Sequence, residues 1–222
     1  MTSDHHPPAI CLFAKRPAPG RVKTRVALKL GDAAAVALAQ ALLADSVSAL
    51  RGIHVGRRVI ATVGELSWVR EHDMEAWDQG DGDLGQRVER ILRRGCEEQG
   101  AAIAVGADTA GLRAADLDDA VRRLAHADAV LGRAEDGGFW CLGVRRCPPG
   151  WLTPVRWSAA TTADDVEAAL RALGVRAAPL PVRRDVDTVA DLLRPGLDPG
   201  PALSAWLTSW GPVAREADRS DG

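Results

Sequence analysis

The sequence carries almost no net charge, with 28 lysines and arginines against 30 aspartates and glutamates in 222 residues. This balance gives no global case for a nucleic-acid partner. The sequence also lacks G-x-G-x-x-G after its first apolar run, the phosphate-loop motif G-x-x-x-x-G-K-[ST] and the nucleophile motif G-x-S-x-G. No histidine lies near a motif in which it could activate a serine or a cysteine. These absences disfavour hydride transfer by a standard dinucleotide fold and hydrolysis by a catalytic triad.

Targeting segments and a disulfide framework are not indicated either. The four cysteines show neither metal-binding nor redox spacing, and Cys11 and Cys141 fall in apolar runs, which is typical of core residues in a reducing compartment. The N-terminal stretch has no apolar region of the kind that a signal peptide requires. The longest apolar segment, 33–50, contains Gln40 and Asp45 and is expected to be too short to span a bilayer. We therefore expect a cytoplasmic protein that does not bind membranes.

Short apolar runs alternate with longer amphipathic stretches, and this alternation predicts strands separated by helices. With 46% hydrophobic residues, the chain can bury one substantial core. The pattern indicates a single α/β domain of three layers, in which helices cover both faces of a mainly parallel sheet. The expected strands cover residues 10–14, 58–63, 101–106, 129–131, 139–144 and 175–180, and the expected helices cover 33–50, 86–99, 114–126 and 163–173.

The ends of the chain differ from this domain in composition. We expect residues 1–9 to form a flexible N-terminus and residues 10–194 to form the domain. Residues 195–222 are rich in proline and glycine at first and polar at the end, so they are expected to form a tail. Four apolar residues of this tail, Leu203, Trp206, Leu207 and Trp210, could dock as a short helix.

Five cations follow the first strand within eleven residues: Lys15, Arg16, Arg21, Lys23 and Arg25. Two prolines and Gly20 restrict this loop, which limits the entropy lost when the cations converge on an anion. Because ligands of open α/β sheets bind at the carboxyl ends of strands, the loop predicts a cradle for phosphate. Taken alone, a solvated basic loop explains the same residues equally well.

Carboxylates gather at the ends of other predicted strands. Asp108 follows the strand at 101–106, Glu135 and Asp136 precede two glycines, and Asp187 follows the last strand. Carboxylates beside a basic loop suit a divalent cation such as Mg²⁺, which bridges one or two carboxylates to substrate phosphates. Asp187 could equally be a turn or helix-capping residue, and this alternative is less favoured for Asp108 because the next helix begins several residues later.

Six motifs in colinear order resemble the DUF2064 family. They are the run from Phe13 to Arg25, Gly82-Asp83-Leu84-Gly85-Gln86-Arg87, Gly106-Ala107-Asp108, Glu135-Asp136-Gly137-Gly138-Phe139-Trp140, Arg156-Trp157-Ser158 and Asp185-Val186-Asp187-Thr188. The resemblance spans about residues 10–193 and implies a GT-A-like nucleotide-diphospho-sugar transferase fold. Two positions depart from the family pattern. Thr109-Ala110 replaces the usual Cys-Pro after Asp108, and Ala159 stands where relatives often have threonine.

The resemblance also implies roles for particular residues. Asp108 would bind Mg²⁺ or Mn²⁺ at the nucleotide-sugar pyrophosphate, with Asp187 as the second metal ligand. Glu135 or Asp136 would be the catalytic base toward an acceptor hydroxyl. Asp83 and Arg87 would bound the nucleoside pocket, and Trp157 would stack on a sugar or base, although a helix start and a core aromatic explain these three as well. The expected substrate-binding residues are Lys15, Arg16, Gly20, Lys23, Thr24, Arg25, Asp83, Arg87, Gly137, Gly138, Trp157 and Ser158.

Three functions remain open from the sequence. The resemblance implies a metal-dependent glycosyltransferase that moves a sugar from a nucleotide diphosphate to a small acceptor. The first loop, with Lys23-Thr24-Arg25, also resembles phospholactate guanylyltransferases, which use a nucleoside triphosphate and a phosphorylated acceptor. Glu135-Asp136-Gly137-Gly138 favours the first function over this nucleotidyltransferase. The third is a nucleotide-binding protein that has lost catalysis.

Overall fold

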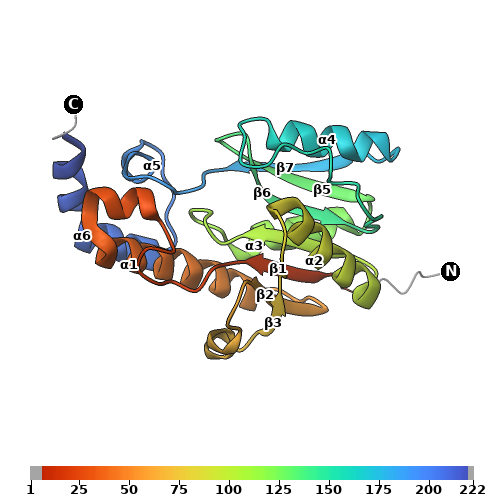
Figure 1. Cartoon of the computed structure of the whole chain (residues 1–222), viewed down its shortest axis with the longest axis horizontal. Coiled ribbons are helices and arrows are strands. Elements are labelled where there is room, and N and C mark those ends of the chain that lie inside the picture. The colour runs from red at the N-terminus through yellow and green to blue at the C-terminus, as the bar shows by residue number, and fades with distance from the viewer. Residues whose placement is uncertain (1–6, 220–222) are drawn as a thin grey trace.

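The computed structural model describes residues 7–219, which form a seven-stranded sheet between two helical layers (Figure 1). The strands lie in the order β3-β2-β1-β4-β6-β5-β7, and only β6 runs antiparallel to its neighbours among them. Their bounds are β1 Ala9–Phe13, β2 Arg57–Thr62, β3 Glu75–Asp78, β4 Ala102–Gly106, β5 Ala129–Ala134, β6 Phe139–Val144 and β7 Ala177–Arg183.

Alternate side chains of the central strands pack against different helices, because successive residues of a strand point to opposite faces. On one face, Ile10 and Leu12 of β1 share a core with α1 (Thr24–Arg51) and α3 (Ala114–Leu124). The other face is covered by α2 (Leu84–Gln99) and α4 (Thr162–Ala172). The predicted α/β class, with a mainly parallel sheet between helices, is confirmed.

Helix α1 is longer than its predicted counterpart, and it is broken at Gly31, whose backbone is not helical (φ 82°, ψ 164°). The part after Gly31 agrees with the helix expected at 33–50. Among the described residues, α1 is the one helix that is long and apolar enough to cross a membrane, with an 18-residue window of mean hydropathy 1.6. The segment 33–50, which the sequence indicated was too short to span a bilayer, is therefore part of a longer helix. However, 56% of that window is buried inside the protein, and core helices of soluble proteins pass the same test.

The C-terminal segment forms α6 (Pro201–Arg219), which packs along α1 beside the short helix α5 (Val189–Leu193) (Figure 1). The helix is 19 residues long, whereas the sequence indicated only a short docked helix. Pro212 lies inside it and lacks the N–H that a helix interior uses. The helix continues past Pro212 because residues on both sides, Leu203, Trp206 and Ala214, are buried against α1.

Two short elements were not expected from the sequence. β3 has only four residues, with an acidic residue at each end, and pairs with β2 at an edge of the sheet. The 3-10 helix η1 (Ser67–His72) precedes β3. Neither has enough periodic residues to be recognised locally. The expected N-terminal segment 1–9 lies mostly outside the described residues, and its last residue, Ala9, is already part of β1.

Candidate active site

A pocket of about 800 Å³ opens at the carboxyl ends of β1 and β4. From β1 the strand order continues to β2 and β3 on one side, and to β4 on the other. Such a change of direction leaves a crevice between the two loops that leave the sheet, and ligands of open α/β folds bind there. The pocket is lined by the loops after β1, β3 and β4, by α1 and the start of α2, and by residues 136, 138, 139, 157–160, 162, 185 and 187.

Lys23 lies at the centre of the charged part of the pocket. Its Nζ is 2.5 Å from an Asp108 carboxylate oxygen and 3.0 Å from one of Asp187. The Lys23 side chain is only 5% exposed, whereas both carboxylates are more than half exposed. Burial by itself lowers the pKa of Lys23, but the two carboxylates outweigh burial, so the pKa of Lys23 is raised above 10.5. Lys23 is therefore a cation held between two accessible carboxylates.

Backbone geometry places the Lys23 side chain there. Lys23 precedes α1 in the left-handed conformation (φ 44°, ψ 44°), which a residue with a side chain adopts only at a cost. This conformation turns the chain from the loop into α1. Gly20, three residues earlier, has φ 68° in a turn closed by the Arg21 N–H and the Ala18 carbonyl oxygen (3.1 Å). Gly20 thus shapes the loop without lining the pocket.

The two acidic segments meet through their backbones. The N–H of Val186 donates to the Asp108 carbonyl oxygen (3.0 Å), and the N–H of Ala110 donates to the Arg184 carbonyl oxygen (2.9 Å). This pairing brings Asp108 beside the segment that carries Asp185 and Asp187.

Asp185 is a third carboxylate of the site. Its Oδ1 accepts a hydrogen bond from Thr109 Oγ1 (3.1 Å). Burial, followed by the nearby Asp108 carboxylate, raises the pKa of Asp185 to about 7. The sequence places Asp185 in the same acidic motif as Asp187 but assigns it no role. Its burial depends on the pairing of segments that are 76 residues apart.

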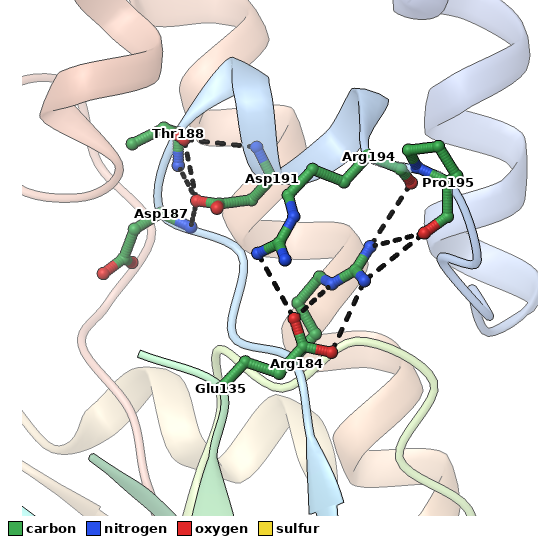
Figure 2. A network of polar contacts seen from close by, with 7 residues as sticks. All are labelled: Glu135, Arg184, Asp187, Thr188, Asp191, Arg194 and Pro195. Carbon is green, nitrogen blue, oxygen red and sulfur yellow. Dashed lines mark hydrogen bonds and ion pairs between the residues drawn. The ribbon is translucent and has the colours of Figure 1, made fainter. Parts of the chain in front are cut away.

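Asp187 is positioned by a capping box at the start of α5. One carboxylate oxygen of Asp191 accepts hydrogen bonds from the N–H of Asp187 (3.1 Å), the N–H of Thr188 (2.8 Å) and the hydroxyl of Thr188 (2.8 Å) (Figure 2). Asp191, and not Asp187, therefore forms the capping box of α5 together with Thr188. The Asp187 side chain is left to contact Lys23 in the pocket.

Three further cations line the pocket without a partner among the described residues: Lys15, Arg21 and Arg25. Arg87, on the first turn of α2, also lines the pocket, and its buried Nε has no hydrogen-bond partner in the described chain. Unpaired guanidinium and ammonium groups around one cavity favour an anionic ligand. Arg16 differs from these cations, because it pairs with Glu65 at 2.6 Å and does not line the pocket.

The loop after β3 forms the wall next to Arg87. Gln79 is buried there, and its Nε2 donates to the Ala61 carbonyl oxygen at 2.7 Å. Asp83 does not line the pocket and instead caps α2 by accepting the Gln86 N–H at 2.9 Å. The sequence missed Gln79, since a single glutamine before a glycine-rich loop carries no signal of its own.

The turn between β5 and β6 separates the two predicted bases. Asp136 lines the pocket, and its Oδ1 accepts the N–H of Gly138 at 2.8 Å. Glu135 does not line the pocket and instead contacts Arg184 (3.0 Å) and Arg194 (3.3 Å). The hydrogen bond from Arg184, which favours the ionised form, holds the pKa of Glu135 below its usual value. Of the two, only Asp136 is brought to the pocket.

Gly137 is required at this turn for steric reasons. It has φ 89°, and a Cβ at this position would lie 1.8 Å from the carbonyl oxygen of Ala160. Gly137 therefore lets the segment with Trp157 and Ser158 approach the turn. Trp157 packs edge-on against Phe139 (ring centroids 6.0 Å apart) and over Gly85 while lining the pocket, so its packing and its exposure to a ligand coexist.

The structure thus brings together most of the residues predicted from the sequence. The predicted residues that line the pocket are Lys15, Lys23, Thr24, Arg25, Arg87, Asp108, Asp136, Gly138, Trp157, Ser158 and Asp187. Those that do not are Arg16, Gly20, Asp83, Glu135 and Gly137. Residues that line the pocket although the sequence assigned them no role include Gln79, Leu84, Phe139 and Asp185.

The donor set is compatible with a hard divalent cation. Asp108 and Asp187 already share one cation, the ammonium group of Lys23, and carboxylate oxygens are the ligands that Mg²⁺ and Mn²⁺ prefer. Within residues 7–219, no group of three or more His, Cys, Asp or Glu side chains is arranged to hold a metal ion. The protein would therefore supply two carboxylates, and the phosphates of a substrate would complete the coordination.

Comparisons with known proteins agree with the motifs and the fold. The model of a family described as "Uncharacterized protein conserved in bacteria (DUF2064)" matches residues 54–159, which confirms the resemblance to that family. The matched range includes the Asp108 and Asp136 motifs but neither the basic loop nor Asp187. Among curated proteins, no sequence matches the chain.

Solved structures share the fold over nearly the whole chain. A protein from Desulfovibrio desulfuricans G20, described as a "putative nucleotide-diphospho-sugar transferase", has a TM-score of 0.83 and 24% identity, covering 94% of this chain and 97% of that one. A cytidylyltransferase from Leptospira borgpetersenii has a TM-score of 0.56 at 14% identity, covering 85% and 84%. A CMP:2-keto-3-deoxy-manno-octonic acid synthetase complexed with CTP has a TM-score of 0.53 at 14% identity, and the match covers 83% of this chain and 95% of that one. The chain therefore has the nucleotide-diphospho-sugar transferase fold.

Proposed function

We propose that the protein is a metal-dependent glycosyltransferase, which moves a sugar from a nucleotide diphosphate donor to a hydroxyl of a small acceptor. The observation that carries this proposal is the Lys23 ammonium group held between Asp108 and Asp187, in a pocket that also presents three unpaired cations. Such a centre neutralises the charge that develops on a diphosphate leaving group.

The pocket has room and chemistry for three parts of a donor and acceptor. Gln79, Leu84 and Arg87 line the end beside α2, where a nucleoside would lie. Lys23 lies between the carboxylates of Asp108 and Asp187, and Lys15 and Arg25 line the same pocket, where a diphosphate would lie. Asp136, Phe139 and Trp157 form a further part of the lining, where an aromatic face suits a sugar, and Trp157 packs over Gly85 at the start of α2. A volume of about 800 Å³ is in the range of small-molecule sites.

Asp108 and Asp187 are the residues that would hold Mg²⁺ or Mn²⁺. When bound, the ion would supply positive charge to the diphosphate of the donor. Lys23 would then shift its contact from the carboxylates to the phosphate oxygens, since ammonium groups bind phosphate as point charges.

Asp136 is the proposed general base. Transfer of a sugar to a hydroxyl requires that the hydroxyl lose its proton, and a positioned carboxylate accelerates this step. Asp136 lines the pocket, and its hydrogen bond from the Gly138 N–H orients the carboxylate. Replacing it with asparagine should lower turnover by about 10²–10⁴-fold while leaving donor binding nearly unchanged.

A nucleotidyltransferase is the second candidate. Two of the structures that share the fold are a cytidylyltransferase and a CMP-sugar synthetase bound to CTP, and a basic loop after β1 would serve a triphosphate equally well. The protein from Desulfovibrio desulfuricans, with a TM-score of 0.83, is instead described as a putative nucleotide-diphospho-sugar transferase. An acceptor that already carries an ionised phosphate needs no base, so the presence of Asp136 in the pocket favours sugar transfer.

Donor hydrolysis distinguishes these functions before any acceptor is known. The protein is incubated with Mn²⁺ and a panel of nucleotide sugars, and release of nucleoside diphosphate is followed; in parallel, nucleoside triphosphates are tested for release of pyrophosphate. We expect diphosphate release from at least one sugar donor. Pyrophosphate release without any diphosphate release would establish the nucleotidyltransferase. Nucleotide binding without either product would indicate a catalytically inactive binding protein.

The metal assignment has its own test by calorimetry. Asp108→Asn should abolish Mn²⁺-dependent nucleotide binding without altering the fold, because one of two charged ligands is lost. Asp118→Asn, an exposed position on α3 outside the pocket, is the matched control and should bind as wild type does. Unchanged affinity in the Asp108 variant would refute the assignment.

A further inference from the structure

We propose that Glu135 and Arg184 form a latch that sets the spacing between Asp136 and the segment carrying Asp185 and Asp187. Glu135 is then a positioning residue and not the catalytic base. This inference rests on the proposed function, in which Asp136 and Asp187 act on one substrate complex.

Glu135 is held by two arginines that come from different segments (Figure 2). Arg184 Nε donates to Glu135 Oε2 at 3.0 Å, and Arg184 Nη2 donates to Oε1 at 3.4 Å. Arg194, at the end of α5, lies 3.3 Å from Glu135 Oε2. A fork-shaped guanidinium that contacts both oxygens of a carboxylate fixes direction as well as distance.

The Arg184 side chain also reaches the link between α5 and α6. Its guanidinium donates to the carbonyl oxygens of Arg194 (3.3 Å) and Pro195 (3.4 Å). The Arg184 side chain is only 14% exposed, so its contacts are shielded from solvent compared with those of surface pairs. One side chain therefore connects the β5–β6 turn, the end of β7 and the start of the C-terminal helices.

Backbone hydrogen bonds transmit the latch to the pocket. The N–H of Glu135 donates to the Arg183 carbonyl oxygen at 2.9 Å, and the Arg184 carbonyl oxygen accepts the N–H of Ala110 at 2.9 Å. Each latch residue is followed directly by a carboxylate of the pocket, Asp136 after Glu135 and Asp185 after Arg184. Movement of the latch would therefore move the acceptor side of the pocket relative to the metal side.

The alternative role for Glu135, as the base, is disfavoured by its surroundings. Both of its oxygens are occupied by arginine donors, and Glu135 does not line the pocket. The hydrogen bond from Arg184 lowers the pKa of Glu135, which makes it a weaker proton acceptor. Asp136, one residue later, has access to the pocket that Glu135 lacks.

A double-mutant cycle on full-length protein tests the latch. Glu135→Gln, Arg184→Gln and the double variant are compared for donor hydrolysis and for amide hydrogen exchange. Each single variant should lower turnover about 10- to 100-fold, the scale found for residues that orient the residues of a site without contacting the substrate. The double variant should lose no more than the worse single variant, because both changes remove one contact. Amide exchange should become faster in 134–138 and 183–188 and stay unchanged in β4.

Additional variants separate positioning from catalysis. Glu135→Asp and Arg184→Lys, which keep the charges, should recover part of the turnover, and the acidic limb of the pH profile should persist in Glu135→Gln. Arg123→Gln, which breaks a surface pair on α3, is the control. The latch would be overturned if the losses of turnover in the two single variants added up in the double variant. It would also be overturned if Glu135→Gln lost the acidic limb of the pH profile while its amide exchange stayed unchanged. If wild type hydrolyses no donor, the proposed function fails, and unchanged exchange in the variants would overturn the latch independently.

Discussion

At the scale of single residues, the site is organised by charges that only folding brings together. Lys23 is nearly buried, and yet it is charged because Asp108 and Asp187 surround its ammonium group. Its left-handed backbone is the kind of local strain that persists where surrounding contacts over-determine it. The left-handed backbone and the two ion pairs together fix the Lys23 ammonium group between the carboxylates of the pocket.

The Lys23→Ala variant should bind nucleoside diphosphates more weakly by about 1.5–3 kcal/mol, the scale of a hydrogen bond to a charged group. Affinity for the nucleoside alone should change little, because the nucleoside end of the pocket lies beside Gln79 and Arg87. Calorimetry with both ligands measures the difference. Arg16→Ala provides a contrast within the same loop, since Arg16 faces Glu65 outside the pocket and its loss should have little effect. Equal binding by wild type and Lys23→Ala would assign Lys23 to structure alone.

Asp185 should make the stability of the metal-free protein depend on pH. Its folded pKa of about 7 lies above the ordinary aspartate value of 3.8, so the folded state binds more protons than the unfolded state between these values. The free energy of unfolding therefore falls as pH rises from about 4 to about 7. In Asp185→Asn the free energy of unfolding should fall less between pH 4 and pH 7. At pH 8 this variant should therefore be more stable than wild type.

Urea unfolding in the presence of a chelator, at several values of pH between 5 and 8, measures this contribution. Asp118→Asn serves as the control, because Asp118 is exposed and lies outside the pocket. A decline with pH that is the same in the Asp185 variant and in wild type would show that the carboxyl group is ionised throughout.

At the scale of secondary-structure elements, one buried carboxylate explains how α6 docks on α1. Asp45 of α1 accepts hydrogen bonds from the first free N–H groups of α6, those of Ala202 (2.9 Å) and Leu203 (3.0 Å). A Cβ on Gly200 would lie 2.4 Å from the Asp45 carboxyl carbon, so a glycine is needed where the chain enters α6. The buried carboxylate of Asp45 in α1 is therefore a cap for another helix, α6.

Asp45→Ala should destabilise the protein by about 1–3 kcal/mol, because a buried and a partly buried N–H group lose their acceptor. Chemical denaturation of the variant and of wild type measures the change in the free energy of unfolding. Gln40→Ala, an exposed change on the same helix, is the matched control and should stay within about 0.5 kcal/mol of wild type. If both variants behaved alike, Asp45 would not be the cap that its contacts indicate.

At the scale of the whole molecule, the C-terminal helices are continuous with the α/β domain. Helix α1 contributes Leu43, Val47 and Leu50 to the core beneath the sheet, and Leu38 and Leu42 to the core that holds α5 and α6. The same C-terminal unit is tied to the sheet by the contacts of Arg184. Two cores that share one helix should not unfold independently.

We therefore predict one cooperative unfolding transition for residues 10–219. Far-ultraviolet circular dichroism reports the helices, and tryptophan fluorescence reports both cores, since Trp68 and Trp140 lie in the first and Trp206 in the second. The two signals should change at the same denaturant concentration. Transitions at different denaturant concentrations would show that the two cores unfold separately.

The sequence by itself determined the fold class and the elements with strong local periodicity. The strands at β1, β4 and β6 and the helices α2 and α3 agree closely with the apolar patterns, because these patterns reflect which side chains each element buries. The edge strand β3, the break at Gly31 and the full length of α6 could not be predicted, since packing against neighbours stabilises them more than their own residues do.

The types of site residue were also readable from the sequence, whereas their assembly was decided by tertiary structure. Cations after β1 and carboxylates after β4 predicted an anion site, because strand ends of an α/β sheet share one edge. That Lys23 bridges Asp108 and Asp187, and that Asp136 enters the pocket while Glu135 binds arginines, depends on contacts between segments 49 to 164 residues apart. No local pattern encodes which of two adjacent carboxylates faces a pocket, because a single turn of the backbone, closed by distant partners, selects the direction of each.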